Sequence, residues 1–265
     1  MGISLCVVGA TGKFGRAVIS QADSDVKIMG AVCTDDNLNV GKTISELGLS
    51  GHGPIINGAS HIEKASAESD VVLFVSKPEA DLTNIPKVTA LRKRIVVGTT
   101  GFNTTQAEQL DSMLKTVPSV ISTNFSVGAN ILFEVTELLS RFNNLYDYSI
   151  IEEHHKLKAD APSGTAKTMR QLLNRDSKFP VTITDRTARP KRMGGEVEVV
   201  SLRGGGTPGI HQLVLSGDHD MIRVEHTAFS RASMATGALL ACKWIASQAK
   251  PGIYSMKDVL GLTQA

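Results

Sequence analysis

The sequence predicts an α/β protein in which a doubly wound parallel sheet is followed by an α+β part with a mixed sheet. Up to about residue 125, short β-rich runs alternate with helical stretches, which is the pattern of a parallel sheet with crossover helices. Between residues 181 and 228, strand-like runs follow one another without long helices between them. With 265 residues, of which 42% are hydrophobic, the chain has the length and composition of two modest domains.

Short apolar runs mark the expected strands of the first part, at residues 3–8, 26–33, 71–75, 95–98 and 117–122. Helices are expected between them at residues 13–22 and 104–115. Asn103 and Gln106 have the spacing of a capping box, which marks the start of the second of these helices.

The second part begins with an apolar helix that contains residues 131–139 and leads into a strand at residues 146–153. Further strands are expected around residues 197–199, 213–215 and 222–224, joined by glycine-rich turns. A helix over residues 232–248 follows, and we expect it to return to the first domain. The predicted domains are therefore residues 1–126 with 234–265 for dinucleotide binding, and residues 127–233 for the substrate.

Charge and composition exclude several classes of partner. The formal charge is only +2, which gives no electrostatic reason to expect a nucleic acid. No run approaches the ~18 apolar residues of a membrane span, and the amino terminus has no signal-peptide pattern, so no membrane partner or export is expected. Cys6, Cys33 and Cys242 lie far apart and show no metal-binding spacing, which predicts no metal site and a reduced, cytoplasmic location.

A glycine-rich turn follows the first expected strand, and it contains Gly9, Ala10, Thr11, Gly12, Lys13, Phe14 and Gly15. Gly9 permits the tight turn, Gly12 lets backbone amides approach a pyrophosphate, and Gly15 allows the helix to pack close to the strand. The amino terminus of that helix favours an anion. A strand, this turn and a helix together predict a Rossmann-like dinucleotide site, whereas without that context three glycines would be only a flexible turn.

The second expected strand leads into Asp35, about 20 positions after the glycines. An acidic side chain there accepts hydrogen bonds from the ribose 2′-hydroxyl of NADH and repels the 2′-phosphate of NADPH. The alternative is that Asp35 and Asp36 are solvated loop residues, in which case Lys13 and Lys42 are free to hold a phosphate. Both NADH and NADPH therefore stay open as cofactors.

Two further strand ends are expected at the carboxyl edge of the sheet, where open α/β sheets bind ligands. Small and hydroxylated residues follow there, and we expect them to line the cofactor, although each loop alone is equally typical of an ordinary turn. These residues are Gly98, Thr99, Thr100, Ser122, Thr123, Asn124 and Phe125.

Residues 151–165 carry the densest group of chemically active side chains. Strand alternation places Glu152 and His154 on one face and sends His155 to the other. Ser163 is a natural cap for a helix that begins at Gly164, and the first amides of that helix make a receptor for a carboxylate.

A histidine near its ordinary pKa of ~6.5 can donate or accept a proton at neutral pH, and a lysine is a cation there. His154 and Lys158 together therefore suit the protonation of an anionic intermediate. The alternative is a solvated His/Lys loop followed by a capped helix. Residues 203–206, an arginine and three glycines, are interpreted as a turn.

With these residues identified, the chain resembles the 4-hydroxy-tetrahydrodipicolinate reductase (dihydrodipicolinate reductase) family over nearly its whole length. The resemblance rests on four ordered segments, of which the most specific runs from Glu153 through His154, His155 and Lys158 to the stretch at residues 160–166. The other three are residues 97–102, 124–128 and 226–231. Thr34 stands where the family often has an acidic residue, so the family's cofactor preference cannot be transferred.

This resemblance implies the reduction of 4-hydroxy-tetrahydrodipicolinate by NADH or NADPH in lysine and diaminopimelate biosynthesis. It implies that His154 is the principal acid/base residue, that Lys158 is a second proton donor, and that His155, Gly164 and Thr165 bind a dicarboxylate substrate. Ser163, which precedes these two residues, is expected to take part in substrate binding. The turn at residues 9–14 and the two later strand ends would line the nicotinamide cofactor, and homotetramers would form through the substrate domain.

Three other functions compete with this one. A non-catalytic NAD(P)-binding redox sensor explains residues 1–125 but leaves the His/Lys segment unused. A short-chain dehydrogenase needs a lysine four residues after a tyrosine, and Tyr146, Tyr148 and Tyr254 lack it. A thiol-dependent semialdehyde dehydrogenase needs an exposed cysteine, whereas Cys6 lies in a strand pattern and Cys242 in a helical one.

Overall fold

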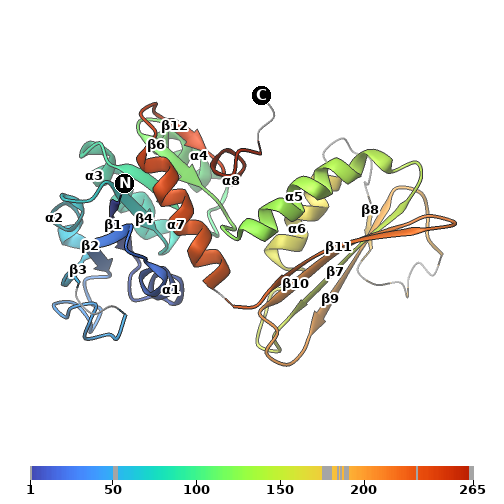
Figure 1. Cartoon of the computed structure of the whole chain (residues 1–265), viewed down its shortest axis with the longest axis horizontal. Coiled ribbons are helices and arrows are strands. Elements are labelled where there is room, and N and C mark those ends of the chain that lie inside the picture. The colour runs from blue at the N-terminus through green and yellow to red at the C-terminus, as the bar shows by residue number, and fades with distance from the viewer. Residues whose placement is uncertain are drawn as a thin grey trace. The chain divides into compact units, whose positions relative to one another are not determined.

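The computed structural model describes residues 2–49, 53–174, 181–183, 185, 187, 191–230 and 232–262. The chain forms two compact units (Figure 1). The first consists of Met1–Ser126 with Ala232–Ala265, and the second of Val127–Arg231. Within the described residues, no helix has both the length and the apolar character that crossing a bilayer requires.

The first unit contains a seven-stranded sheet in which all paired strands are parallel. The strand order is β12-β6-β5-β4-β1-β2-β3, so the direction of winding reverses between β1 and β4. In such sheets this reversal opens a crevice at the carboxyl ends of the strands. The strands are β1 Ile3–Val8, β2 Val26–Cys33, β3 Ile56–Gly58, β4 Val71–Phe74, β5 Arg94–Val97, β6 Pro118–Ile121 and β12 Gly252–Tyr254.

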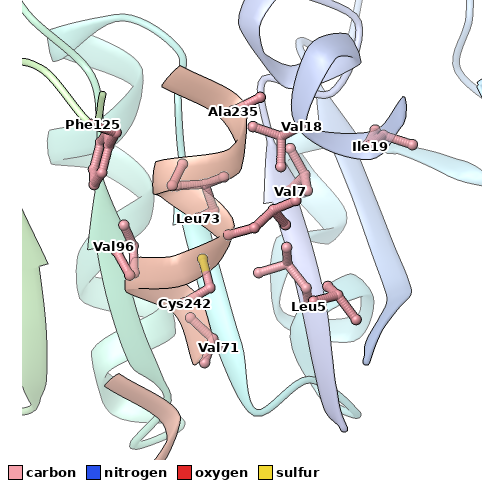
Figure 2. Packing of buried hydrophobic residues seen from close by; sticks show 14 of the residues in the cluster. Leu5, Val7, Val18, Ile19, Val71, Leu73, Val96, Phe125, Ala235 and Cys242 are labelled. Atoms are coloured by element: carbon pink, nitrogen blue, oxygen red, sulfur yellow. The ribbon is translucent and has the colours of Figure 1, made fainter. Parts of the chain in front are cut away.

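Helices cover both faces of this sheet. One face packs against α1 (Lys13–Gln21), α7 (Ala232–Ala246) and α8 (Met256–Val259). The other face packs against α2 (Ile62–Ser66), α3 (Pro78–Ala90) and α4 (Thr104–Leu114), with the short 3-10 helix η1 (Ala59–His61) before α2. Figure 2 shows Val7, Leu73 and Val96 on neighbouring strands beneath α7, which contributes Ala235 and Cys242 to the same core. The arrangement is a doubly wound Rossmann-like fold.

Helix α7 lies unusually close to the end of the sixth strand. A Cβ atom built on Gly237 would stand 1.8 Å from the carbonyl oxygen of Phe125. No side chain fits in that space, so glycine allows the helix to cover the sheet at this point.

The second unit contains a five-stranded mixed sheet with the order β11-β10-β7-β9-β8. Strand β10 is antiparallel to β7 and β11, whereas β9 is parallel to β7 and β8. The strands are β7 Asp147–His154, β8 Val181–Ile183, β9 Glu196–Arg203, β10 Gly209–Ser216 and β11 Met221–Ala228.

Two helices, α5 (Val127–Leu139) and α6 (Gly164–Leu173), pack on one face of the mixed sheet (Figure 1), and the 3-10 helix η2 (Ser140–Phe142) follows α5. Along β7, Tyr148 and Ile150 point into this core, and the alternation continues through the buried Glu152 and His154. The fold class predicted from the sequence, a doubly wound parallel sheet with a second unit containing a mixed sheet, is confirmed.

Candidate active site

The glycine-rich turn has the backbone that a dinucleotide site requires. Gly9 has a φ of +92°, and a Cβ there would lie 2.4 Å from the carbonyl oxygen of Val75. A Cβ on Gly15 would lie 2.2 Å from the carbonyl oxygen of Gly9, so glycine is needed for α1 to start this close to β1. Gly12 is the N-cap of α1 and is exposed, as is Lys13. The exposed amino terminus of α1 is the kind of site that favours an anion such as a pyrophosphate.

The other residues predicted to line the cofactor lie at the carboxyl ends of β5 and β6, on the same edge of the sheet as the turn after β1. A Cβ on Gly98 would approach Phe125, Val75 and Phe14 at 2.9, 3.2 and 3.4 Å, so this glycine lies close to two other predicted residues, Phe125 and Phe14. Ala10 and Thr99 are buried, whereas Thr11 is partly buried.

Three polar groups complete this edge of the sheet. Thr100 and Thr123 are exposed. The Ser122 hydroxyl donates a 2.7 Å hydrogen bond to the carbonyl oxygen of Asn124, which shapes the loop after β6.

Asp35 is exposed at the end of β2, but its carboxylate has a partner within the first unit. Its Oδ1 accepts hydrogen bonds from the backbone amide and the hydroxyl of Ser60, at 3.0 and 2.7 Å. These hydrogen bonds hold the pKa of Asp35 below its usual range. A ribose that approached this carboxylate would therefore compete with Ser60.

A buried carboxyl group, Asp81 on α3, lies behind the same edge. Its side chain accepts a short hydrogen bond from the Ser76 hydroxyl, and the Ser76 amide donates to the Thr99 hydroxyl at 2.9 Å. Burial raises the pKa of Asp81 to about 6, although hydrogen bonds from Ser76 and Thr99 act in the opposite direction. Asp81 thus links the loops that follow β4 and β5.

In the second unit, Glu152 and His154 form a buried pair on β7. Glu152 Oε2 lies 2.5 Å from His154 Nδ1, and the two residues are 0% and 8% exposed. Arg203, at the end of β9, donates hydrogen bonds to both carboxylate oxygens of Glu152, with Nη1–Oε2 and Nη2–Oε1 distances of 3.1 and 2.8 Å. Because β9 pairs with β7 in register His154↔Arg203, the guanidinium arrives beside the carboxylate.

A second histidine, His211 on β10, joins the same group. Its ring centroid lies 5.0 Å from that of His154, with the two planes at 72°. Its Nε2 is 3.0 Å from the Ser163 hydroxyl, which also caps α6 by accepting a hydrogen bond from the Ala166 amide. Among the described residues, His211 Nδ1 has no hydrogen-bond partner.

The surroundings set the charge of each group. Burial alone would raise the pKa of Glu152, but hydrogen bonds from Arg203, Ser201, His154 and Ser163 outweigh it and hold that pKa below its usual range. Burial lowers the pKa of His154, and Glu152 offsets only part of this shift. Burial lowers the pKa of His211 to about 4, and repulsion from His154 adds to the effect. At neutral pH the group therefore contains an ionised carboxylate, a guanidinium and two neutral imidazoles.

The remaining predicted residues lie beside this group on the chain. The Lys158 ammonium is 2.7 Å from Asp160 Oδ1, so in this structure the lysine is paired within its own loop. His155 follows the end of β7 and is partly buried. Gly164 and Thr165 form the first turn of α6, with Ser163 as its N-cap, as predicted.

Glu152, His154 and His211 also have the composition of a metal site, because their ligand atoms lie within 4.8 Å of one another. The carboxylate, however, already accepts two hydrogen bonds from a guanidinium, and a cation bound there would meet that positive charge. We therefore interpret the group as an ion-paired cluster rather than a metal site.

Sequence reasoning missed two of these residues. Arg203 was assigned to a turn, which is wrong: it is the last residue of β9, and its side chain holds Glu152. His211 was not singled out at all. Both reach the site through pairing with β7, and a single sequence gives no signal for that register. Arg231, in one of the resemblance segments, lies outside the described residues.

The three cysteines are free and buried. Burial raises the pKa of the Cys6 thiol to about 12 and that of Cys242 above its usual range. A thiolate nucleophile is thus unfavourable at either position, which argues against thiol-dependent chemistry.

Comparison with protein families covers both units. Residues 3–125 match the model described as "Dihydrodipicolinate reductase, N-terminus", and residues 128–260 match "Dihydrodipicolinate reductase, C-terminus".

Individual relatives agree with this match. The 4-hydroxy-tetrahydrodipicolinate reductase of Aquifex aeolicus is 35% identical over 270 residues, covering 99% of this chain and 100% of that protein. The same enzyme of Methanopyrus kandleri is 34% identical, covering 97% and 96% of the two chains. Among solved structures, the dipicolinate-bound dihydrodipicolinate reductase of Paenisporosarcina sp. TG-14 is similar in fold, with a TM-score of 0.73 at 20% identity over 96% of this chain and 98% of that one. The chain belongs to the dihydrodipicolinate reductase family.

Proposed function

We propose that this protein catalyses the reduction of 4-hydroxy-tetrahydrodipicolinate to tetrahydrodipicolinate by NADH or NADPH, a step of lysine and diaminopimelate biosynthesis. Its membership of the reductase family supports this reaction. The observation that carries the proposal is the buried Glu152–His154 pair beside the capped start of α6, because it combines a proton-transfer group with a receptor for an anion.

The first unit would hold the cofactor. Its glycine turn and the loops after β5 and β6 are the proposed contacts, through Gly9, Ala10, Thr11, Gly12, Lys13, Phe14, Gly98, Thr99, Thr100, Ser122, Thr123, Asn124 and Phe125. The close approach of the turn to the end of β4 and to the start of α1, which only glycine permits at Gly9 and Gly15, supports this assignment. Asp35 belongs to the proposal as a contact to the ribose, in competition with Ser60.

The second unit would hold the dicarboxylate. The amino terminus of a helix carries the positive end of its dipole, so the start of α6, with Ser163 as its N-cap, suits one carboxylate at Gly164 and Thr165. His155 and Lys158 would offset the remaining negative charge, with Lys158 released from Asp160 as the substrate binds. Ser163 fixes the start of the helix through its cap.

When bound, the reduced nicotinamide supplies a hydride to C4 of the conjugated cyclic imine that forms by loss of water. The product of that transfer is an enamine-like anion. His154, after it has taken up a proton from water on Nε2, would give that proton to the neighbouring carbon with the assistance of Lys158, and the ring would return to its neutral form. Donors that the protein already holds in position stabilise such an anion more strongly than water does, because they need no reorientation. The sum is one hydride and one proton added across the double bond.

We also assign the protein to the cytoplasm as a homotetramer assembled through the mixed sheet. Support comes from the sheet face opposite α5 and α6, where Val200 and Leu202 are 37% and 47% exposed. Apolar side chains exposed on a sheet face are typical of a subunit interface. The redox-sensor alternative is not favoured, because the relatives are reductases.

The decisive experiment supplies purified protein with the condensation product of aspartate semialdehyde and pyruvate, and follows the absorbance of NADH and NADPH separately. Oxidation that depends on the substrate is expected with at least one cofactor. Binding of either nucleotide without substrate-dependent oxidation would overturn the proposal and favour a sensor.

A further inference from the structure

We propose that Glu152, held by Arg203, is a positioning residue that fixes the orientation and the tautomer of His154 during the reaction. This inference rests on the proposed function, in which His154 delivers the proton. Neither Glu152 nor Arg203 needs to contact the substrate in this role. A purely structural ion pair would not change the pH profile of kcat, whereas a positioning role would.

Several hydrogen bonds converge on the Glu152 carboxylate. Oε2 bonds His154 Nδ1 at 2.5 Å and Arg203 Nη1 at 3.1 Å, while Oε1 bonds Arg203 Nη2 at 2.8 Å and the Ser163 amide at 3.1 Å. The carboxylate is fully buried. One side chain therefore fixes both the imidazole and the residue that caps α6, so the proton donor and the proposed carboxylate receptor share one anchor.

The ionised state of Glu152 determines which nitrogen of His154 carries the proton. A carboxylate only accepts hydrogen bonds, so the neutral imidazole must carry its hydrogen on Nδ1. Within the described residues, Nε2 has no partner, and it lies near Gly209, where a built Cβ would stand 3.1 Å away. Nε2 is therefore the atom that receives and delivers the catalytic proton. After delivery the ring returns to the same tautomer.

Arg203 keeps this arrangement intact. Its bidentate contact favours the ionised form of Glu152 despite burial, and its Nη2 also donates to the carbonyl oxygen of Asp160 at 2.6 Å. Without the guanidinium, burial would favour a protonated Glu152, which could donate to His154 and reverse the tautomer.

The titratable and charged groups around His154 come from four segments. They are Glu152 on β7, Arg203 on β9, His211 on β10 and Lys158 in the loop after β7. Glu152 is the anion that raises the proton affinity of His154, whereas Lys158 and Arg203 lower it. His211, neutral at pH values above about 4, adds no charge in the working range.

The test compares Glu152→Gln with a matched control, Glu153→Gln, in the same reductase assay. Glu153 is the next residue on β7 and lies on the opposite face of the strand, where it accepts a hydrogen bond from Thr207. In E152Q we expect kcat to fall by at least about 10-fold, the loss typical of removing a group that orients a catalytic histidine. We also expect the apparent pKa of His154 in the pH dependence of kcat to fall by about one unit, because the neighbouring negative charge is gone. E153Q should keep the wild-type kcat and profile.

A second variant and a measurement on wild-type protein cover the case in which E152Q fails to fold. E152Q/R203M removes both charges and leaves no buried ion without its partner, so its fold is expected to persist. Its acidic shift of the profile should be smaller than that of E152Q, because Arg203 lowers the proton affinity of His154 and is removed as well. Nitrogen-15 NMR of the wild-type imidazoles, assigned with His154→Gln, should show His154 protonated on Nδ1 at neutral pH.

The outcomes separate this inference from the proposed function. An inactive wild-type protein overturns the proposed function. If the wild type is active, two results would overturn the positioning role alone. One is a wild-type His154 that is protonated on Nε2, and the other is an E152Q variant that matches E153Q in kcat and pH profile.

Discussion

His154 is the residue on which the proposed chemistry depends most directly. We expect His154→Ala and Lys158→Ala each to lower kcat by about 10² or more, because each removes a group that the proposed proton transfer needs. Steady-state kinetics with the better cofactor measures the loss, and circular dichroism checks the fold. Near-wild-type turnover in both variants would contradict the assignment.

Asp81 is the residue whose titration should affect stability most clearly. Since its pKa is raised from 3.8 to about 6, the native state binds its proton more tightly than the unfolded state, and stability is lost as pH rises through this range. Asp81→Asn removes that loss. Relative to wild type, its free energy of unfolding should therefore increase by about 1–2 kcal/mol between about pH 5 and about pH 8.

Urea unfolding at the two pH values tests this prediction. Asp70, another acid of the first unit, provides the control, because hydrogen bonds from Ser4 lower its pKa. Asp70→Asn should therefore show no gain with rising pH. An equal stability difference for Asp81→Asn at both pH values would mean that Asp81 does not titrate as described.

At the residue scale, local patterns predicted some of the site. Alternation along β7 correctly placed Glu152 and His154 on one buried face, and the cap preference of serine correctly started α6 at Gly164. Arg203 and His211 could not be found this way, because their place depends on how β9 and β10 pair with β7. The catalytic and binding roles of the predicted residues stay predictions.

At the scale of single elements, the start of α1 depends on close backbone packing. Gly15→Ala places a methyl group 2.2 Å from the Gly9 carbonyl oxygen, and the only relief is to move the helix away from β1. We expect a loss of about 1–3 kcal/mol in the free energy of unfolding and at least 10-fold weaker nucleotide binding.

Ser20→Ala is the matched control, because Ser20 is exposed on the same helix. It should leave both quantities unchanged. Thermal unfolding and fluorescence titration with NADH and NADPH give the two readouts, and unchanged binding in Gly15→Ala would remove the turn from the cofactor site.

Element prediction succeeded where the hydrophobic pattern was strong. Strands β1 and β2 have the predicted bounds, and α4 begins at Thr104 behind its capping box. No bounds were predicted for helix α3, since Pro86 interrupts its pattern and its apolar stripe is weak. The short β3 and β12 were also missed, because three residues give too little periodicity to detect.

At the scale of the whole molecule, the exposed face of the mixed sheet leads to a prediction about assembly. Val200→Glu places a charge on that face, and we expect it to convert tetramers into smaller species, because a buried charge without a partner is costly. Sedimentation velocity measures the change. Leu38→Glu, at a residue of the first unit that is 90% exposed, should have no effect. A monomeric wild type would contradict the proposed tetramer.

The place of α7 in the first unit has a consequence for synthesis on the ribosome. The helix that closes one side of the parallel sheet is encoded more than a hundred residues after β6, and its Gly237 contacts the backbone at Phe125. A nascent chain that has just emerged up to residue 126 therefore still displays the apolar surface of Val96 and Leu73 to water. We expect this half of the protein to depend on chaperones until residue 246 has left the exit tunnel, although its amino-terminal strands are made first.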